Sequence, residues 1–272
     1  MHISDSIRPV TVSIVSHSHW AHVEPLLRQL SKFCAASIER VILTLNLPES
    51  VRLDDDLAFP VEVVGNPLPR GFGTNHNAAF SRTLTPWFLV MNPDLRIDAD
   101  IVGTLLSCAD EEVGLLAPRV LEPGRGGPEP YRDIVTPWEL VRRRRQDHVP
   151  PDLPSWIAGM FMLVRSAAYG EVRGFDERFF MYCEDVDLCV RLQLAGWKLQ
   201  VATDLVVHHQ AQRDSHSSLR AMTWHLTSFL KLWTSEGFWR YVRLRRGWRA
   251  HASTVTLCRG RPRSEQEPRS PC

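Results

Sequence analysis

The 272-residue sequence predicts an α/β protein in which a mixed, mostly parallel sheet is flanked by helices. Two features of the sequence favour this fold class. Short runs of β-branched and aliphatic residues recur along the chain, and segments with apolar residues at helical spacing lie between them. Strands and helices that alternate in this way form parallel sheets with helices on both faces. The hydrophobic share of 44% is ordinary for a globular protein and provides a sizeable core.

The first half of the chain alternates regularly. Residues 10–16 (VTVSIVS) form a β-branched run of strand length, and residues 22–34 follow with one apolar helix face made of Val23, Leu26, Leu27, Leu30 and Phe33. The strand pattern returns at 40–45, 61–64, 87–91 and 113–120. Between these strands we expect a short helix at 75–82, entered through a Gly-rich turn, and a helix at 101–108.

The second half contains a long interruption. Between Glu122 and Pro154 the pattern gives way to Gly, Pro and Arg, so we expect a long mobile loop of the kind that often acts as a lid. Order returns at 156–165 (WIAGMFMLVR), a helix ends at Gly196, and a strand follows at 199–203. The apolar stripe of a long amphipathic helix comes last and comprises Leu219, Met222, Leu226, Phe229, Leu230 and Trp233.

Charge divides the chain into two parts. The formal net charge is +1, but residues 236–272 hold nine Arg and three Glu, which gives this part +6 and leaves −5 for the rest. We therefore expect one domain at 1–235 and a basic, aromatic extension at 236–272 that is disordered after Glu265. The six cysteines form no C-x-x-C pair and suit the reduced thiols of a cytoplasmic protein. The N-terminus lacks the apolar core of a secretory signal, and no stretch has the apolar length of a membrane-spanning helix.

Polar residues at two predicted strand ends are the first candidates for a ligand site. Asp94 follows the apolar run 87–91 within the stretch NPD, and open α/β sheets bind ligands at the carboxyl ends of their strands. Taken alone, Asp94 is either a turn former or a metal ligand. Asn46 and Glu49 follow the second strand in the same way.

A Gly-rich turn supplies the next candidate. The stretch RGFGTNHN at 70–77 precedes a predicted helix, and its Gly-x-Gly exposes backbone N–H groups that can bind a phosphate. The alternative is an ordinary tight turn. Asn75 and Asn77 likewise suit either the start of a helix or hydrogen bonding to a ligand.

Carboxylates and histidines gather in the second half of the chain. Glu184, Asp185 and Asp187 lie at the start of a helix, where the macrodipole favours negative charge, but their aromatic neighbours also suit a cleft wall. Helical spacing separates Asp185 and Asp187 by roughly 200°, so only one of them can face a ligand and act as a base. His208 and His209 point to opposite sides of an extended segment. The histidine that faces a ligand can join a carboxylate in a partial shell for a divalent cation.

In their order along the chain, these motifs resemble a known family. A Gly-rich loop with asparagines, NPD after an apolar strand, GMFMLVR, GFDERFF, EDVDL and a late histidine are similar to the motifs of family 2 glycosyltransferases, most of all the rhamnosyltransferase-like branch. The likeness extends from about Val10 to Trp233. Each motif is modest alone, but the combination and order are specific. The resemblance implies the GT-A nucleotide-diphospho-sugar transferase fold.

The resemblance also implies a reaction, namely the inverting transfer of a sugar from a nucleotide diphosphate sugar to an acceptor hydroxyl, with Mg²⁺ or Mn²⁺ on the leaving diphosphate. It assigns the metal to Asp94, the last acid of a D-x-D motif, and to His209, and it assigns the general base to Asp185. The donor side is expected to comprise Asn46, Arg70, Gly71, Gly73, Asn75, Asn77 and Asn92. The acceptor side is expected to comprise Trp156, Gly159 and Glu184.

One departure from the family affects the donor. Many members have an acidic turn after the second strand in which an Asp contacts the nucleobase, whereas this chain has LTLNLPE. Asn46 can take that part, and Glu49 is the poorer candidate. The substitution favours dTDP-rhamnose as the donor and leaves UDP- and GDP-sugars open.

The expected acceptor is a saccharide or a lipid-linked saccharide of cell-surface polysaccharide synthesis. Aromatic and Arg residues in 238–248 (FWRYVRLRRGW) suit a peripheral contact with the cytoplasmic face of the inner membrane, and the alternative is a solvated basic segment with core-packing aromatics. The competing function is a catalytically silent GT-A-like module that binds nucleotide sugars or glycans. A nucleic-acid binder ranks last, because the body of the chain is net acidic.

Overall fold

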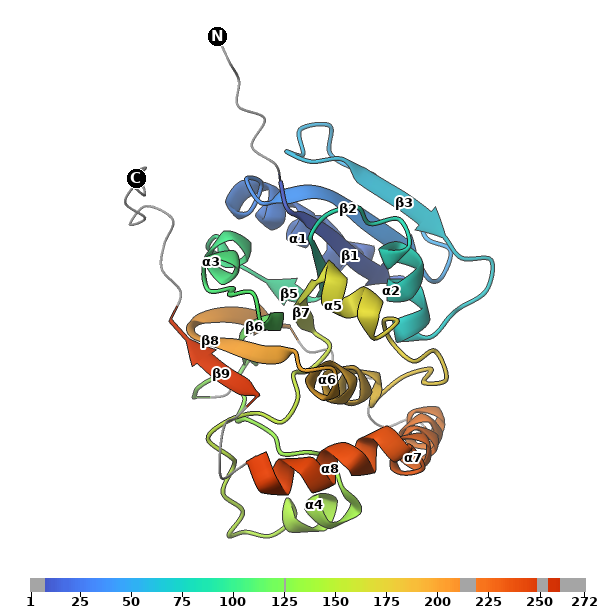
Figure 1. Ribbon diagram of the computed structural model, residues 1–272. Helices are drawn as coiled ribbons and strands as arrows, with labels where there is room; N and C mark the ends of the chain where they lie inside the picture. The colour runs from blue at the N-terminus through green and yellow to red at the C-terminus, as the bar shows by residue number, and fades with distance from the viewer. Residues whose placement is uncertain (1–7, 125, 211–218, 249–253, 260–272) are drawn as a thin grey trace, which may run out of the picture.

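The computed structural model describes residues 8–124, 126–210, 219–248 and 254–259, and Figure 1 shows their arrangement. The strands are β1 (Val10–Ser16), β2 (Ile38–Leu45), β3 (Val61–Gly65), β4 (Trp87–Met91), β5 (Leu95–Arg96), β6 (Val113–Leu121), β7 (Phe161–Arg165), β8 (Lys198–His209) and β9 (Val255–Cys258). The helices are α1 (Trp20–Phe33), α2 (Phe72–Phe80), α3 (Ile101–Ser107), α4 (Pro137–Arg142), α5 (Ser166–Glu171), α6 (Glu184–Leu194), α7 (Leu219–Trp233) and α8 (Glu236–Trp248).

The described strands form one sheet with the order β3-β2-β1-β4-β7-β6-β8-β5, and β9 adds to it beside β8. Parallel pairing joins β1 to β2 and β4, β2 to β3, and β8 to β6 and β9, whereas β4–β7, β6–β7 and β5–β8 are antiparallel. This confirms the predicted mixed, mostly parallel sheet.

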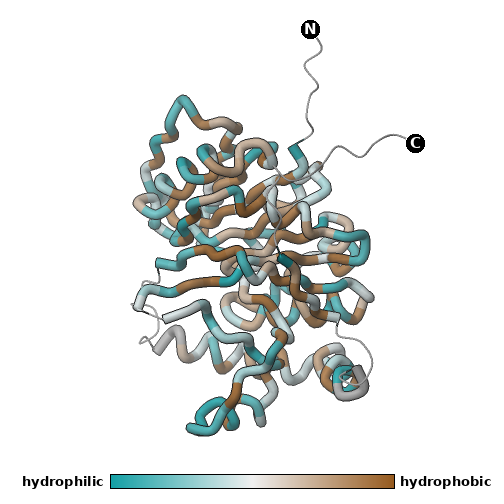
Figure 2. Tube along the Cα trace, turned by 90° about the vertical axis from the view of Figure 1, so that its left-hand side faces the viewer, coloured by the Kyte–Doolittle hydropathy of each residue, from teal (hydrophilic) through white to brown (hydrophobic). Residues whose placement is uncertain are grey.

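Helices cover both faces of the sheet, which has a separate apolar core on each side. Along β4, Phe88 and Val90 belong to one core and Leu89 and Met91 to the other, because successive side chains of a strand point to opposite faces. The first core lies against α2, α5, α6 and α8, and the second lies against α1 and α3. The buried strands appear as the brown centre of the tube in Figure 2.

Two elements differ from the sequence prediction. The strand expected at 199–203 continues to His209, because its second half pairs with β6 and β5 after an irregularity between Pro118 and Arg119 in the β6 register. The loop expected at 122–154 contains α4, which begins with Thr136 as a cap that accepts a hydrogen bond from the Glu139 N–H (3.1 Å). The mobility expected for this loop stays a prediction.

The described part of the 236–272 extension packs on the first core. Phe238 and Tyr241 of α8 are each 1% exposed, and β9 pairs in parallel with β8. The predicted disordered tail after Glu265 lies outside the described residues, and the division of the chain at residue 235 stays a prediction. The cysteines of the described ranges are free thiols, and none of the described helices has both the length and the apolar character needed to cross a membrane.

Candidate active site

Strand pairing brings Asp94 and His209 together. β5 pairs antiparallel with the end of β8, so that Leu95 lies opposite His209, and the Gln210 N–H donates to the Asp94 carbonyl (2.9 Å). His209 Nε2 lies 3.1 Å from Asp94 Oδ2. The neighbouring His208 is exposed, so of the two histidines it is His209 that faces the carboxylate.

The Asp94–His209 pair fits a divalent cation as a partial shell. Asp94 Oδ1 and His209 Nδ1 are buried and make no hydrogen bond to any described residue. A carboxylate and an imidazole suit a manganese-like ion, which keeps other positions for substrate oxygens and water. In the described ranges of the chain no cluster of three or more His, Cys, Asp or Glu is arranged to hold an ion.

A second carboxylate lies beside this pair. Glu122 Oε1, at the end of β6, is 3.8 Å from His209 Nδ1. Burial disfavours the charged form of His209, but the hydrogen bond and the charge of Asp94, together with the charge of Glu122, outweigh burial and raise the pKa of His209. The surroundings of His209 are therefore strongly negative and attract cations.

Asp185 lies at the start of α6, and two backbone amides hold its carboxylate. The Gly159 N–H donates to Asp185 Oδ2 (3.1 Å), and the Val186 N–H donates to Oδ1 (2.8 Å). Gly159 is followed by Met160, whose carbonyl accepts a hydrogen bond from the Asn92 N–H (2.9 Å). Two consecutive residues thus connect the Asp185 carboxylate to the NPD turn that carries Asp94.

The backbone just before Asp185 is strained. Tyr182 and Cys183 have φ angles of 70° and 66°, in the left-handed region that residues other than Gly rarely adopt. Each such residue costs roughly 1–3 kcal/mol, and such strain occurs preferentially at functional sites. Here it starts α6 abruptly after the GFDERFF loop and leaves Glu184 and Asp185 in the first turn.

Burial shifts the protonation of these two carboxylates. For Glu184, burial and then the charge of Asp185 raise the pKa to about 8, and its Oε2 atom has no hydrogen-bond partner among the described residues. Burial also raises the pKa of Asp185, although the amides of Gly159 and Val186 and the charge of Arg132 oppose this. Near neutral pH, Glu184 therefore tends to hold a proton, whereas two backbone amides stabilise the carboxylate form of Asp185.

Asp187 has a different environment. Its Oδ2 accepts a hydrogen bond from Arg191 Nε (2.7 Å), and Arg191 also donates to the carbonyls of Val172 (2.6 Å) and Gly174 (2.8 Å). This ion pair ties α6 to the turn after α5. Asp187 is thus occupied within the protein, whereas Asp185 faces Gly159.

Several residues expected to bind the sugar donor make hydrogen bonds that hold the loop at 66–70. Asn46 Oδ1 accepts hydrogen bonds from the Arg70 N–H (2.8 Å) and from Asn66 Nδ2 (2.9 Å), and Asn46 Nδ2 donates to the Arg70 carbonyl (3.0 Å). Asn75 Oδ1 accepts a further hydrogen bond from Asn66 (2.7 Å). The structure thus shows Asn46 holding the loop in position, and its expected contact with a nucleobase stays a prediction.

Arg70 and Asn92 are the expected donor residues whose side chains stay available. Arg70 is exposed, and its guanidinium makes no hydrogen bond or ion pair to a described residue. The Asn92 side chain is half-buried beside Asp94 and hydrogen-bonds to none of the residues described. Both side chains can therefore reach a ligand without breaking a contact within that part of the protein.

The glycines of the Gly-x-Gly turn allow two chain segments to pack closely. A Cβ atom at Gly71 would lie 2.8 Å from the Phe180 carbonyl oxygen, and one at Gly73 would lie 2.5 Å from Phe175 Cβ. The Phe72 N–H donates to the same Phe180 oxygen (2.9 Å). The glycines and the amide between them therefore face the GFDERFF loop, and the expected binding of a phosphate by this turn stays a prediction.

Asn77 belongs to the same packing contact. Its Oδ1 accepts hydrogen bonds from the Tyr169 hydroxyl (2.7 Å) and the Phe175 N–H (2.9 Å), and its Nδ2 donates to the Phe175 carbonyl (2.9 Å) and to Glu177 Oε1 (3.0 Å). Asn77 thus links α2 to α5 and the GFDERFF loop, and its expected contact with the donor stays a prediction.

Trp156, which was expected on the acceptor side, is buried. Its Nε1 donates to the Asp133 carbonyl (3.1 Å), and the Asp133 carboxylate accepts hydrogen bonds from Ser155 Oγ (2.7 Å) and from Arg245 of α8. The segment that leads to Gly159 and Asp185 is thus held by the 122–154 loop, and α8 in turn holds this loop.

Sequence reasoning missed two residues of the site. Glu122 had a local signal, because it directly follows a predicted strand, as Asp94 does. Met160 had none, since it takes part through its backbone carbonyl. A further histidine, His17, follows β1 and lies with its Nδ1 3.2 Å from Asn46 Nδ2, which adds a third strand end to the donor side.

The sheet has the GT-A fold, and the Gly159–Met160 segment before β7 connects the Asp185 carboxylate to the turn that carries Asp94. Comparison with known proteins agrees. A solved structure of GalNAc-T7 with UDP, GalNAc and Mn²⁺ has a TM-score of 0.64 at 14% identity, over 91% of this chain and 52% of that one. At this identity the likeness concerns the fold.

Sequence comparison identifies the family. The model of glycosyl transferase family group 2 matches residues 87–260, and the chain belongs to this family. The N-acetylglucosaminyl-diphospho-decaprenol L-rhamnosyltransferase of Mycobacterium tuberculosis is 30% identical over 271 residues, which cover 84% of this chain and 86% of that protein. Rhamnosyltransferase WbbL of Escherichia coli K12 is 49% identical over 74 residues, or 27% of this chain and 28% of that protein. The expected rhamnosyltransferase-like family is thereby confirmed.

Proposed function

We propose that this protein is an inverting, metal-dependent glycosyltransferase that moves rhamnose from dTDP-rhamnose to a hydroxyl of a lipid-linked saccharide in cell-surface polysaccharide synthesis. The observation that carries the proposal is the link through Gly159 and Met160. Their backbone groups hold Asp185 at 3.1 Å and Asn92 at 2.9 Å, so a base and a metal-binding turn share one short segment.

In this proposal each side chain has a separate task. A divalent cation held by Asp94 and His209 would neutralise the charge that builds up on the leaving diphosphate. Asp185 accepts the proton of the acceptor hydroxyl, a contribution of roughly 10²–10⁴ to the rate. Burial raises the pKa of Asp185, which makes it a stronger base than a solvated carboxylate. Attack from the side of Asp185 and departure on the side of Asp94 give inversion.

The donor assignment rests on the relatives and on the loop before α2. Both relatives are named rhamnosyltransferases, and a rhamnose donor is our inference from that likeness. On the protein side, we assign donor contacts to Arg70 and Asn92, and we assign to Asn46 and Asn75 the task of fixing the Arg70 backbone.

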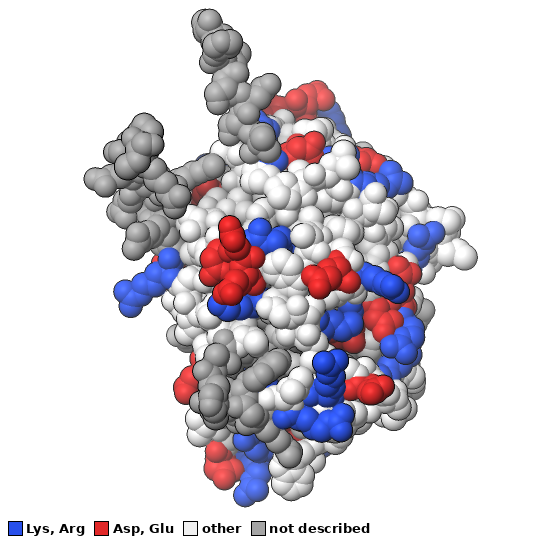
Figure 3. All heavy atoms as spheres, viewed as in Figure 1, with Lys and Arg blue, Asp and Glu red and all other residues white. Residues whose placement is uncertain are grey.

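We also propose a peripheral contact with the cytoplasmic face of the membrane, where a lipid-linked acceptor would reside. The outer face of α8 supports this contact, because Trp239 and Leu244 are 37% and 39% exposed and Arg240 and Arg243 lie exposed between them. In Figure 3, Lys and Arg side chains lie over the lower part of this face, where Figure 1 draws α7 and α8. Anionic lipid attracts such a surface.

A panel of nucleotide sugars tests the proposal without an acceptor. The purified protein is incubated with MnCl₂ and with dTDP-rhamnose, UDP- or GDP-sugars, and the slow release of nucleoside diphosphate is measured. We expect dTDP-rhamnose to be hydrolysed fastest, and EDTA to stop the release. Equal and EDTA-insensitive background rates for all donors would overturn the proposal.

A further inference from the structure

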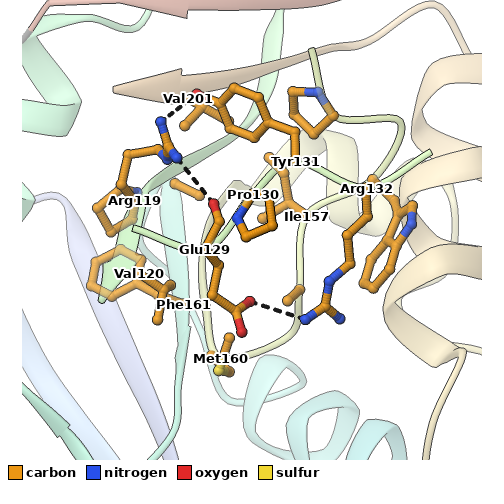
Figure 4. A pocket seen from close by; sticks show the side chains of 15 residues that line it. Arg119, Val120, Glu129, Pro130, Tyr131, Arg132, Ile157, Met160, Phe161 and Val201 are labelled. Atoms are coloured by element: carbon orange, nitrogen blue, oxygen red, sulfur yellow. Dashed lines mark hydrogen bonds and ion pairs between the residues drawn. The ribbon is translucent and has the colours of Figure 1, made fainter. Parts of the chain in front are cut away.

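A cavity of about 70 Å³ lies between the ends of β6 and β8, the 129–132 segment and the residues that lead into β7. Ala158 and Met160 both line it, and Gly159 between them donates to Asp185. Figure 4 shows Glu129, Arg132 and Met160 side by side in its wall. The backbone segment that holds the proposed base thus also forms part of the cavity wall.

Two arginines line this cavity, and they differ in how many contacts their guanidinium groups make within the protein. The Arg119 guanidinium donates to the Tyr131 hydroxyl (3.3 Å) and the Glu129 carbonyl (3.0 Å), and it lies 4.4 Å from the Tyr131 ring centroid. Arg132 makes one hydrogen bond, from Nη2 to Glu129 Oε2 (3.1 Å), and its side chain is 43% exposed. Such exposed ion pairs contribute little to stability, so Arg132 can exchange this partner for a ligand.

The backbone of Arg132 is nevertheless fixed. Its carbonyl accepts a hydrogen bond from the Ser155 N–H (2.9 Å), and the next residue, Asp133, accepts hydrogen bonds from Ser155 Oγ and the Trp156 indole. The guanidinium lies 5.7 Å from the Trp156 ring centroid. The charge of Arg132 also opposes the effect of burial on the pKa of Asp185 and lowers it. A cation on a fixed anchor is thus held near the proposed base.

We propose that Arg132 binds the diphosphate of a lipid-linked saccharide acceptor, and this proposal rests on the proposed function. An acceptor whose reacting sugar is joined directly to a diphosphate brings two phosphates within one sugar ring of the base. The planar guanidinium forms paired hydrogen bonds to phosphate oxygens, which a single Glu129 contact leaves available. The acceptor sugar then packs against Trp156 and the apolar wall of the cavity.

The test compares two acceptors in Arg132→Met, which keeps the length of the side chain and removes its charge. One acceptor is N-acetylglucosaminyl diphosphate on a short isoprenoid, and the other is an alkyl glycoside of N-acetylglucosamine without phosphate. We expect KM for the diphosphate acceptor to rise roughly tenfold to a hundredfold, as for the loss of hydrogen bonds to a charged group. KM for the glycoside should stay at the wild-type value, and any change of kcat that comes from the altered pKa of Asp185 should be the same for both acceptors.

Arg28→Met is the matched control, because Arg28 lies on α1 with a side chain that is 59% exposed and pairs with Glu24 and Asp54. It should change neither KM. An equal rise for both acceptors in Arg132→Met, or no rise for either, would overturn the proposal. If turnover of the glycoside is too slow for a KM, its inhibition constant against the diphosphate acceptor gives the same comparison. Absence of donor hydrolysis in the wild-type protein would instead contradict the proposed glycosyltransferase function.

Discussion

The Gly159 N–H donates a hydrogen bond of 3.1 Å to Asp185 Oδ2, and this contact joins the proposed base to the strand that runs beside β4. Because the Val186 N–H holds the other carboxylate oxygen, Asp185 has one orientation relative to the NPD turn. Through Met160, the residue after Gly159, the same segment also contacts Asn92 of that turn.

Asp185→Asn should abolish transfer and leave donor binding nearly intact. The amide keeps the size of the carboxylate but cannot take a proton, so kcat/KM for the acceptor should fall by at least roughly 10²–10⁴. Transfer kinetics and calorimetric titration with dTDP and MnCl₂ measure the two effects. A loss of dTDP affinity as large as that caused by Asp94→Ala would contradict this division of tasks.

Asp94→Ala and His209→Ala should each weaken Mn²⁺-dependent nucleotide binding, because each removes one of the two protein ligands proposed for the ion. We expect the affinity for dTDP in the presence of MnCl₂ to fall by roughly tenfold or more, as changes around metal sites commonly do. His208→Ala is the control, since His208 is adjacent but exposed. Calorimetry that gives unchanged affinity in both variants would refute the metal assignment.

The sequence identified both members of the Asp94–His209 pair but not the strands that bring them together. Asp94 follows a predicted strand, whereas neither β5 nor the second half of β8, whose pairing joins the two side chains, was predicted. The sequence also did not predict the contacts made by Asn46 and Gly71. The bonds of Asn46 to the Arg70 backbone and the approach of Gly71 to Phe180 are contacts between distant segments, and no local pattern encodes them.

In the C-terminal part, charge composition was a poorer guide to the structure than helical periodicity. The sequence suggested either a membrane-bound extension or a solvated basic segment with core-packing aromatics, and Phe238 and Tyr241 are spaced three residues apart, as on one helix face. In the structure both are buried, and the basic residues Arg240 and Arg243 lie on the opposite, exposed face of α8. Charge composition concealed an amphipathic helix that helical periodicity was able to reveal.

Glu184→Gln should make the protein less sensitive to rising pH. Burial and the Asp185 charge raise the pKa of Glu184 from 4.5 to about 8, so between these values the unfolded chain is ionised there while the folded protein holds the proton. The unfolded state thus binds fewer protons, and the free energy of unfolding falls as the pH rises through this window. Glutamine does not titrate and removes this contribution.

Urea denaturation of the wild-type protein and Glu184→Gln at pH 5 and pH 8 checks this expectation. The variant should gain stability relative to the wild type on going from pH 5 to pH 8. A difference between the two proteins that is the same at both pH values would show that Glu184 ionises normally in the folded protein.

Gly71→Ala should destabilise the protein and lower its activity, because the new Cβ would lie 2.8 Å from the Phe180 carbonyl oxygen. Backbone does not yield easily, so we expect a loss of about 1–3 kcal/mol in the free energy of unfolding. Gly65→Ala is a matched control, since a Cβ there has no neighbour within 4 Å among the described atoms. Equal stability of the two variants in urea would contradict the packing role of the turn.

The membrane contact proposed for α8 is best tested by surface substitutions. A chain that ends at Ser235 would lose the buried side chains of Phe238 and Tyr241, so its failure to bind vesicles would report on folding. Arg240→Ala combined with Arg243→Ala changes only exposed residues.

At about 1 kcal/mol for each Arg near an anionic surface, the double variant should partition into phosphatidylglycerol vesicles roughly thirtyfold less well than the wild type. Arg28→Ala combined with Arg82→Ala removes the same charge from side chains that are 59% and 50% exposed elsewhere, and it should sediment as the wild type does. The two double variants separate a local contact from a general effect of net charge. If both sediment equally with the vesicles, α8 does not dock the protein on the membrane.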